Sequence, residues 1–416
     1  MDAWSTGCGG ASASTRCLAS GTDGFLSVSA AVPGRRYLLR TVIVVIRWRS
    51  GRVIEVGRRW SSAVEVRVEV HRPSGADHTA EQGAGSSVTT IPALAYTDVV
   101  GSPQVGDLVL LNVTALDLEL GTGGYALVAA IPDRLPGDPD GPGHLVKARY
   151  TPLQMTVLGV DEQESPHHEL LRDADDLAGM PVVVADLHSA LPAIIAGLRQ
   201  RQPDASVAYV STDGGALPLA FSRSVQGLRD AGWLTGTITV GQTFGGDLEA
   251  VTVHNGLLAA HLVLEADVTI VAQGPGNLGT GTRWGFSGVA AGEAINAAAT
   301  LGGRPVAALR VSEADKRTRH YGVSHHSLTA YGRVAVHPAD IPVPLLPGAL
   351  GKQVASQAAS LSPPHHLAEI EVDHLEGALR ASPVELSTMG RGLDSDRAAF
   401  VASAAAGRHA AALLGS

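Results

Sequence analysis

The sequence predicts a two-domain α/β protein: a Rossmann-like, mostly parallel sheet flanked by helices, preceded by a small antiparallel β-barrel or sandwich. Between residues 45 and 160, short β-type runs alternate with turn residues and no convincing helix intervenes. From about residue 165, apolar runs alternate with helical patterns. The length of 416 residues also favours two hydrophobic cores, because a single core rarely grows beyond roughly 250 to 300 residues.

The first segment, residues 1–44, shows no periodic apolar pattern and contains both cysteines. We expect it to be disordered or to derive from an over-extended reading frame, with the folded domain starting near Val45. Two cysteines in a Gly/Ser/Ala-rich stretch argue against a disulfide framework or a cysteine-based metal site. The apolar run at 41–46 is far shorter than the roughly 20 residues that span a bilayer, and no secretory signal is visible. These features predict a cytoplasmic protein without membrane contact.

The segment 45–160 reads as the small all-β domain. An alternating run from Val45 is typical of an edge strand, and a half-buried strand is indicated by valines at positions 64, 66, 68 and 70 that alternate with charged residues. A strand at 105–120, a "GTGG" turn and a returning strand at 125–132 follow. "HLVKARY" and "MTVLGV" predict two further short strands, and "LPGDPDGPG" can only be a loop.

The segment 165–340 shows the strand and helix alternation of a Rossmann-like domain. Strands are expected at 181–186, 206–211, 237–241, 267–273 and 305–311. Helices are expected between them at about 191–198, 216–228, 248–264 and 289–300. Continuous apolar runs are typical of strands covered on both faces, so we expect a parallel sheet of about five strands. Residues 341–416 should then form an extended connector and two closing helices, at 365–380 and 395–414, that pack on this domain.

The two ends of the predicted strands differ in chemistry. Plain turns precede the strands, whereas polar, glycine-rich or charged segments follow them: "DLHS", "STDGGA", "GQTFGGDLEA", "QGPGNLGTGTRWGFSG" and "SEADKRTRHYGVSHHS". In an open parallel sheet the outgoing strand ends share one edge, and ligands bind in the crevice there. We therefore expect the ligand site at this edge.

A glycine-rich segment at 274–282 follows a strand and shortly precedes a helix, a setting in which backbone N–H groups can approach an anion. It matches neither a dinucleotide fingerprint nor a Walker loop, and Pro275 cannot donate a hydrogen bond, so a purely structural loop is the alternative. Arginines near it could neutralise the anion or be ordinary exposed residues, and Asp213 could instead cap a helix. The candidate ligand-binding residues are Gly274, Gly276, Gly279, Thr280, Gly281, Arg283, Asp213 and Arg319.

Histidines and carboxylates of the same edge are the candidates for proton transfer or for binding a divalent metal. They are Asp186, His188, Asp247, His325 and His326. Their spacing matches no known metal motif, so each could equally be a hydrogen-bonded loop residue, and Asp247 could be a helix cap. No G-x-S-x-G elbow is present, which argues against a serine hydrolase triad. The sequence leaves the cofactor and the metal open.

The charge balance restricts the class of partner. A net charge of -9 argues against a nucleic-acid binder, which usually presents a basic face, but is compatible with a small anionic ligand. We therefore expect a binder of, or an enzyme acting on, a small nucleotide-like or phosphorylated molecule. A metal-dependent hydrolase is the more specific version of this hypothesis. The alternative is a non-catalytic assembly or regulatory protein that uses its β domain for interactions. A homo-oligomer is left open.

Several long blocks occur in an order that resembles a bacterial family of domains of unknown function, catalogued under number 3866. They include "LLNVTALDLELGTGGYALV", "MPVVVADLHSALP", "GPGNLGTGTRWGFSG" and "RHYGVSHHSLTA". The resemblance extends roughly from Val45 to the C-terminus and supports placing residues 1–44 outside the common domain. It implies no activity, so no catalytic residues are transferred from it.

Overall fold

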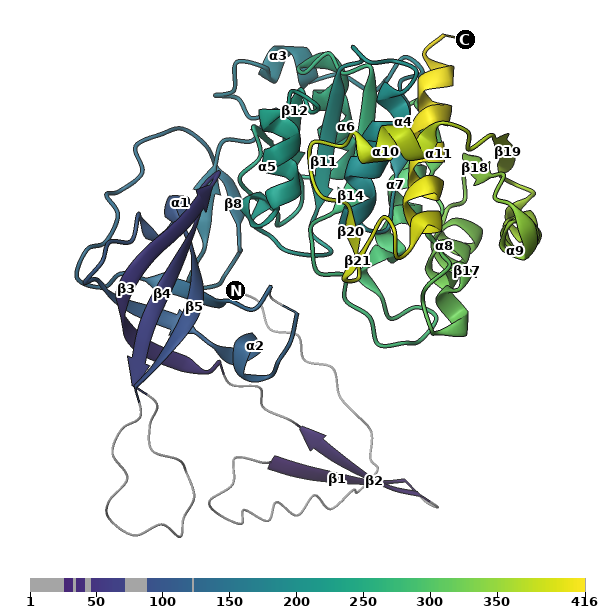
Figure 1. Ribbon diagram of the computed structural model, residues 1–416. Coiled ribbons are helices and arrows are strands. Elements are labelled where there is room, and N and C mark those ends of the chain that lie inside the picture. Colours follow the sequence, from purple (N-terminus) through teal and green to yellow (C-terminus); the bar gives the residue numbers. More distant parts are fainter. Residues whose placement is uncertain (1–25, 33–34, 42–45, 72–87, 122, 416) are drawn as a thin grey trace, which may run out of the picture.

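The computed structural model describes residues 26–32, 35–41, 46–71, 88–121 and 123–415 of the chain. Figure 1 shows a β-barrel on one side and a larger α/β body on the other. The expectation of a disordered or over-extended segment 1–44 lies largely outside the described residues. The strands described within it, β1 (Leu26–Val32) and β2 (Arg35–Thr41), pair with each other in antiparallel fashion. None of the described helices has the length and apolar character needed to traverse a bilayer.

Five strands close the N-terminal barrel in the order β3-β4-β5-β7-β6. They are β3 (Trp48–Trp60), β4 (Ala63–His71), β5 (Val88–Tyr96), β6 (Leu108–Asn112) and β7 (Ala126–Ala130). Short helices α1 (Thr97–Val100) and α2 (Thr114–Asp117) follow β5 and β6. The pair β5 and β7 is parallel and the other pairs are antiparallel, an arrangement like that of five-stranded OB-type barrels. The predicted small β-barrel is confirmed.

The alternation of valines in β4 builds the barrel core. Val64, Val66, Val68 and Val70 are all buried, because successive side chains of a strand point to opposite faces. Gly51 of β3 lies opposite Val70 of β4. A Cβ at this position would lie 2.6 Å from the backbone oxygen of Glu69, so only glycine allows the two strands to approach this closely.

A single sheet of eight parallel strands forms the α/β body, in the order β13-β12-β11-β14-β10-β15-β18-β19. The predicted strands are β10 (Pro181–Val184), β11 (Val207–Thr212), β12 (Gly236–Thr239), β14 (Val268–Gln273) and β15 (Arg304–Ala307). The additional strands are β13 (Leu248–Glu249), β18 (Asp340–Pro344) and β19 (His366–Ile370). The predicted Rossmann-like parallel sheet is confirmed, with three more strands than expected.

Helices cover both faces of this sheet. The face that carries α4 (Leu191–Arg199) and α5 (Arg223–Asp230) has its own buried core, as does the face that carries α6 (Val253–Leu262) and α7 (Ala290–Thr300). The C-terminal helix α11 (Arg397–Leu413) packs against α4. Two glycines permit this contact, since a Cβ at Gly197 or Gly407 would lie 1.9 or 1.8 Å from a backbone oxygen of the facing helix.

Three expected elements differ from the observed ones. The helix expected at 248–264 begins only at Val253, because its first residues pair with β12 as β13. The connector after 340 contains β18 and α9 (Gly348–Ala358). The helix expected at 365–380 is instead β19 followed by α10 (Leu375–Arg380). For β13, β18 and β19, pairing with another strand of the sheet overrides the local pattern.

Short hairpins complete the fold. They are β8–β9 (Leu145–Lys147 and Met155–Val157), β16–β17 (Val311–Ser312 and Gly322–Val323) and β20–β21 (Ser387–Thr388 and Arg391–Gly392). The remaining helices are α3 (His168–Leu171) and α8 (His325–Thr329). The first hairpin is attached to the sheet, because the Nζ of the buried Lys147 lies 3.1 Å from Glu249 Oε2. Residues of the expected β domain therefore pack on the α/β domain.

Candidate functional site

The outgoing edge of the sheet holds an unusual concentration of unsatisfied polar atoms. Among the described residues, five buried side-chain N or O atoms have no hydrogen-bond partner. Three of them belong to residues at or after the outgoing ends of strands: Asp186 Oδ2, Gln273 Oε1 and His325 Nε2. Native proteins leave few such atoms, and each one calls for an explanation such as a missing ligand or ion. The edge at which we expect the ligand thus contains three buried polar atoms without a hydrogen-bond partner.

Asp186 follows β10 and is 3% exposed. Its Oδ2 atom lies 3.6 Å from the Arg310 guanidinium and 3.6 Å from His326 Nδ1. The backbone oxygen of Asp186 accepts a hydrogen bond from Gln273 Nε2 at 2.9 Å. A carboxylate at the end of the central strand is therefore held between a cation and an imidazole.

Three histidines converge beside this carboxylate. One nitrogen of each of His320, His325 and His326 lies within 4.8 Å of the other two. The β16–β17 hairpin returns the chain to α8 immediately after His320, and Ser324 caps that helix by accepting a hydrogen bond from His326 N. Phe286 stacks on the His326 ring, with the centroids 3.8 Å apart and the planes 5° apart. We call these three histidines the histidine cluster.

Burial keeps two rings of the histidine cluster, His320 and His325, uncharged. Desolvation, with the nearby Arg310, lowers the pKa of His320 to about 3. Desolvation and the proximity of His326 lower the pKa of His325 to about 4. Both imidazoles are therefore neutral at pH 7, the form that accepts a proton or binds a metal ion.

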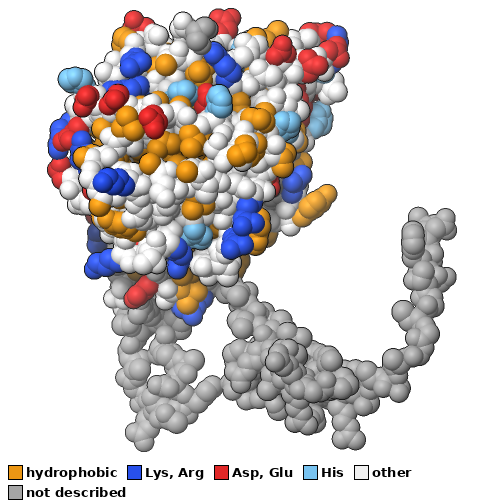
Figure 2. Space-filling view, turned by 90° about the vertical axis from the view of Figure 1, so that its right-hand side faces the viewer, with side chains coloured by type: hydrophobic (Ala, Val, Ile, Leu, Met, Phe, Trp, Pro, Cys, Tyr) orange, Lys and Arg blue, Asp and Glu red, His pale blue; other side chains and the backbone are white. Residues whose placement is uncertain are grey.

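A groove of about 630 Å³ opens beside His325 and is lined by Gly281, Arg283, Arg319 and Arg333. Within the described ranges, no carboxylate forms an ion pair with any of these three arginines. We call this the arginine groove. Figure 2 shows the side of the molecule on which α8, β18 and α9 lie, with acidic side chains mainly in its upper part and Lys and Arg side chains extending over its lower part.

The glycine-rich loop divides its candidate residues between two places. Gly281 and Arg283 line the arginine groove, together with Arg319. Gly274 and Gly276 line a different cleft of about 560 Å³, between the barrel and the α/β body. Gly279 and Thr280 form the turn between them, which is closed by the hydrogen bond from Thr280 N to Gly285 O at 2.7 Å. The loop therefore does not form a single cradle from all of its glycines.

His188 lies in the cleft between the domains, away from the histidine cluster. Its Nε2 is 2.7 Å from Ser222 Oγ, and its Nδ1 is 3.2 Å from the Tyr209 hydroxyl. The Tyr209 hydroxyl donates to Ala272 O at 3.1 Å, so it can accept a proton from Nδ1, while Ser222 donates to Nε2. Burial lowers the pKa of His188 to about 4. The residue is a neutral, internally satisfied group.

Asp213 and Asp247 also lie apart from the histidine cluster. Asp213 Oδ2 accepts a hydrogen bond from Gln242 N at 3.0 Å and caps no helix. Asp247 pairs with Arg229 and accepts from Thr237 N at 2.8 Å. It precedes β13, four strand positions from β10, or about 19 Å at about 4.8 Å per strand. The expectation that Asp247 joins Asp186 is wrong, because "GGDLE" forms an edge strand instead of a helix start.

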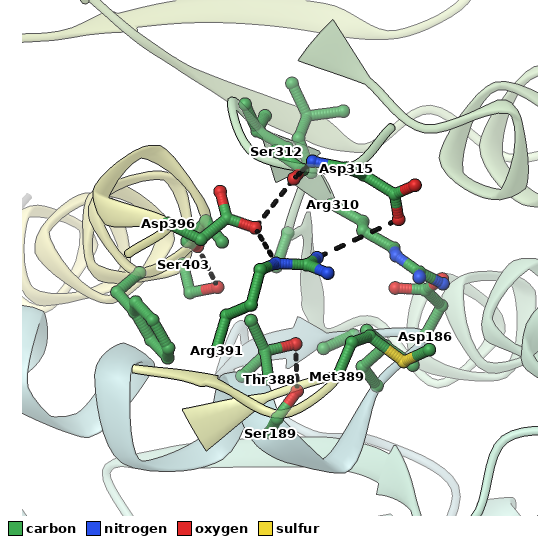
Figure 3. A pocket seen from close by; sticks show the side chains of 18 residues that line it. Asp186, Ser189, Arg310, Ser312, Asp315, Thr388, Met389, Arg391, Asp396 and Ser403 are labelled. Atoms are coloured by element: carbon green, nitrogen blue, oxygen red, sulfur yellow. Dashed lines mark hydrogen bonds and ion pairs between the residues drawn. The ribbon is translucent and has the colours of Figure 1, made fainter. Parts of the chain in front are cut away.

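An ionic network of Asp396, Arg391 and Asp315 lines a small pocket together with Asp186 (Figure 3). Asp396, fully buried, accepts from Ser312 Oγ at 2.6 Å and from Arg391 Nε at 2.9 Å. Arg391 also lies 3.8 Å from Asp315. The space enclosed here is only about 30 Å³, enough for a water molecule. This network holds the β20–β21 hairpin and the start of α11 over the sheet.

The profile of the family described as "Protein of unknown function (DUF3866)" matches residues 92–407, which is most of the 416-residue chain. The chain belongs to the DUF3866 family. Neither a curated protein nor a solved structure matches it. The DUF3866 match contains the whole parallel sheet, the histidine cluster and the arginine groove, and it begins within β5 of the barrel.

Sequence reasoning missed three residues of this DUF3866 site. They are His320, Arg310 and Arg333. His320 had a signal, because it lies in the same "RHYGVSHHS" stretch as the two predicted histidines. Arg310 and Arg333 had none, since only the packing of β15 and of the segment after α8 directs them to the site.

Proposed function

We propose that this DUF3866 protein binds a small phosphorylated or nucleotide-like anion in the arginine groove and hydrolyses it with a metal-activated water. The observation that carries the proposal is the set Arg283, Arg319 and Arg333, which surround one groove without carboxylate partners in the described part of the chain. In a chain with a net charge of -9, such a local excess of positive charge favours an anionic ligand. Guanidinium groups also match phosphate oxygens in geometry.

The neighbouring groups supply the chemistry of phosphoester hydrolysis. Water would add to phosphorus, the bond from phosphorus to the leaving oxygen would break, and the proton lost by water would return to the leaving oxygen. His325 lines the groove and is neutral at pH 7, so it could hold a metal ion beside the phosphate, and that ion would lower the pKa of the attacking water. The proton would pass through solvent to the leaving oxygen. The arginines would stabilise the negative charge of the transition state.

Ligand binding is the direct test. We would titrate inorganic phosphate, pyrophosphate and adenosine monophosphate into the full-length protein by calorimetry. Replacing Arg283, Arg319 and Arg333 together by Gln should weaken phosphate binding at least about 10-fold, equivalent to about 1.4 kcal/mol. The control is Arg172→Gln, an exposed arginine that pairs with Glu169 outside the groove.

Two results would contradict the proposal. One is equal phosphate affinity in the triple variant and in the Arg172→Gln control. The other is no response of the wild-type protein to any of the three anions, which would favour the non-catalytic assembly protein. Release of p-nitrophenol from p-nitrophenyl phosphate then separates a hydrolase from a binder.

A further inference from the structure

We infer that His320, His325 and His326 hold a divalent transition-metal ion of the zinc class, with Asp186 as the positioning carboxylate. The inference rests on the proposed function and names the cofactor of its site. The sequence pattern alone indicated only two of these histidines, His325 and His326, as candidate ligands.

The two ring nitrogens of each histidine are not equivalent. Nδ1 of His320 lies 2.8 Å from Ser324 Oγ, and Nδ1 of His326 lies 3.0 Å from Arg310. In both rings Nδ1 is thus occupied, which leaves Nε2 as the nitrogen available to a metal. The third ring, His325, has a buried Nε2 without a hydrogen-bond partner. Three imidazoles thus each offer one nitrogen to a common centre.

The spacing suits a cation after a small adjustment. One nitrogen of each ring lies within 4.8 Å of a nitrogen of the other two, whereas tetrahedral zinc with ligands at about 2.1 Å would bring its three nitrogens to about 3.4 Å apart. Rotation of the imidazole rings can supply this difference. Neutral imidazole is a preferred ligand of Zn²⁺, Co²⁺ and related ions.

Asp186 completes the arrangement behind His326. Metal-binding histidines usually donate their second ring N–H to a carboxylate or a carbonyl oxygen. Arg310 can only donate, so its present hydrogen bond places the His326 proton on Nε2. With a metal on Nε2, the ring proton would be on Nδ1 and would be donated to Asp186 Oδ2, which lies 3.6 Å away and has no hydrogen-bond partner. The Arg310 guanidinium, also 3.6 Å from Oδ2, would turn from Nδ1 to the same carboxylate. Metal binding would therefore provide a partner for both His325 Nε2 and Asp186 Oδ2.

One coordination position of the metal would remain open. Three protein ligands with one open position are typical of catalytic zinc, whereas structural zinc has four protein ligands. His325 lines the arginine groove, so the metal would lie next to the groove in which the anion is proposed to bind. Arg310 and Arg319 lie close enough to disfavour positive charge on His325, and they should also weaken metal binding until an anion neutralises them.

Metal binding can be measured without any enzyme activity. The full-length protein would be stripped with a chelator, and Zn²⁺ would be titrated against a chromophoric competitor, with Co²⁺ absorption as a second readout. We expect about one ion per chain, and at least about a 10-fold loss of Zn²⁺ affinity in each of His320→Gln, His325→Ala and His326→Gln. His337→Ala, an exposed histidine outside the histidine cluster, is the matched control and should bind normally.

The outcomes are separable from those of the proposed function. Zn²⁺ affinity that is absent in the wild type, or unchanged in a correctly folded His325→Ala variant, would overturn the metal site. Phosphate binding by the metal-stripped protein tests the arginine groove independently. Far-ultraviolet circular dichroism and melting of each stripped variant show whether it folds, and His325→Ala, the least buried of the three, keeps the test valid if the other two do not.

Discussion

Asp186 and His326 follow different strands, yet Asp186 Oδ2 lies 3.6 Å from His326 Nδ1 at the outgoing edge of the sheet. The contact couples a buried carboxylate at the end of β10 to the histidine cluster on α8. It explains why the carboxylate belongs to the candidate site although it does not line the arginine groove. The pair also makes the role of Asp186 testable.

Asp186→Asn should weaken Zn²⁺ binding about 10- to 100-fold, the usual effect of removing a carboxylate behind a metal-bound histidine. The amide keeps the shape of the side chain but removes the negative charge that would hold the Nδ1 proton of metal-bound His326. Competition with a chromophoric chelator measures the change. Asp247→Asn, a former candidate outside the cluster, should bind Zn²⁺ like the wild type. Equal affinities in both variants would refute the positioning role of Asp186.

His188 should make the protein lose stability in weak acid. Its pKa falls from the usual 6.5 to about 4 on folding, so the unfolded chain binds more protons between these values. The contribution of His188 to the free energy of unfolding is fully present above pH 6.5 and disappears as the pH falls toward 4. It amounts to about 3 kcal/mol. Urea unfolding at pH 7 and pH 5 should show that the free energy of unfolding decreases less in His188→Gln than in the wild type. Parallel losses would show that His188 is not the titrating group.

Lys147→Met should strongly destabilise the protein, because it leaves the buried Glu249 carboxylate without its cation. Breaking a buried ion pair in this way typically costs about 3 to 5 kcal/mol. The double variant Lys147→Met with Glu249→Gln carries no uncompensated charge and should recover most of the loss. Chemical denaturation measures the free energy of unfolding of each. A double variant as unstable as the single one would mean that Lys147 acts through packing alone.

Gly197→Ala should separate α4 from α11, since the added Cβ would lie 1.9 Å from Ala404 O. Overpacking of this kind costs about 1 to 3 kcal/mol or more. Gly377→Ala in α10 is the matched control, because nothing lies within 4 Å of its Cβ position. Its helix should gain up to about 1 kcal/mol. Thermal melting should therefore shift in opposite directions for the two variants, and a shared direction would contradict this account of the helix contact.

Local patterns in the sequence were sufficient for the fold class. The alternating valines of β4 indicated the barrel wall, and the continuous apolar runs of β10, β11 and β14 indicated strands covered on both faces. The same runs, with polar segments after them, located the edge on which Asp186, His325 and Arg319 lie. These signals are local, because each depends only on the side-chain period of a single element.

The tertiary structure decided which side chains meet. Strand order places β10 beside β15 and four positions from β13, which brings Arg310 to Asp186 and removes Asp247. The same order turns His366–Ile370 into an edge strand next to β18. Pairing between distant segments and the direction of each side chain depend on the whole sheet, and no local period encodes them. Local patterns therefore sufficed to predict the architecture and the ligand edge, whereas only packing showed that His320 completes the histidine cluster.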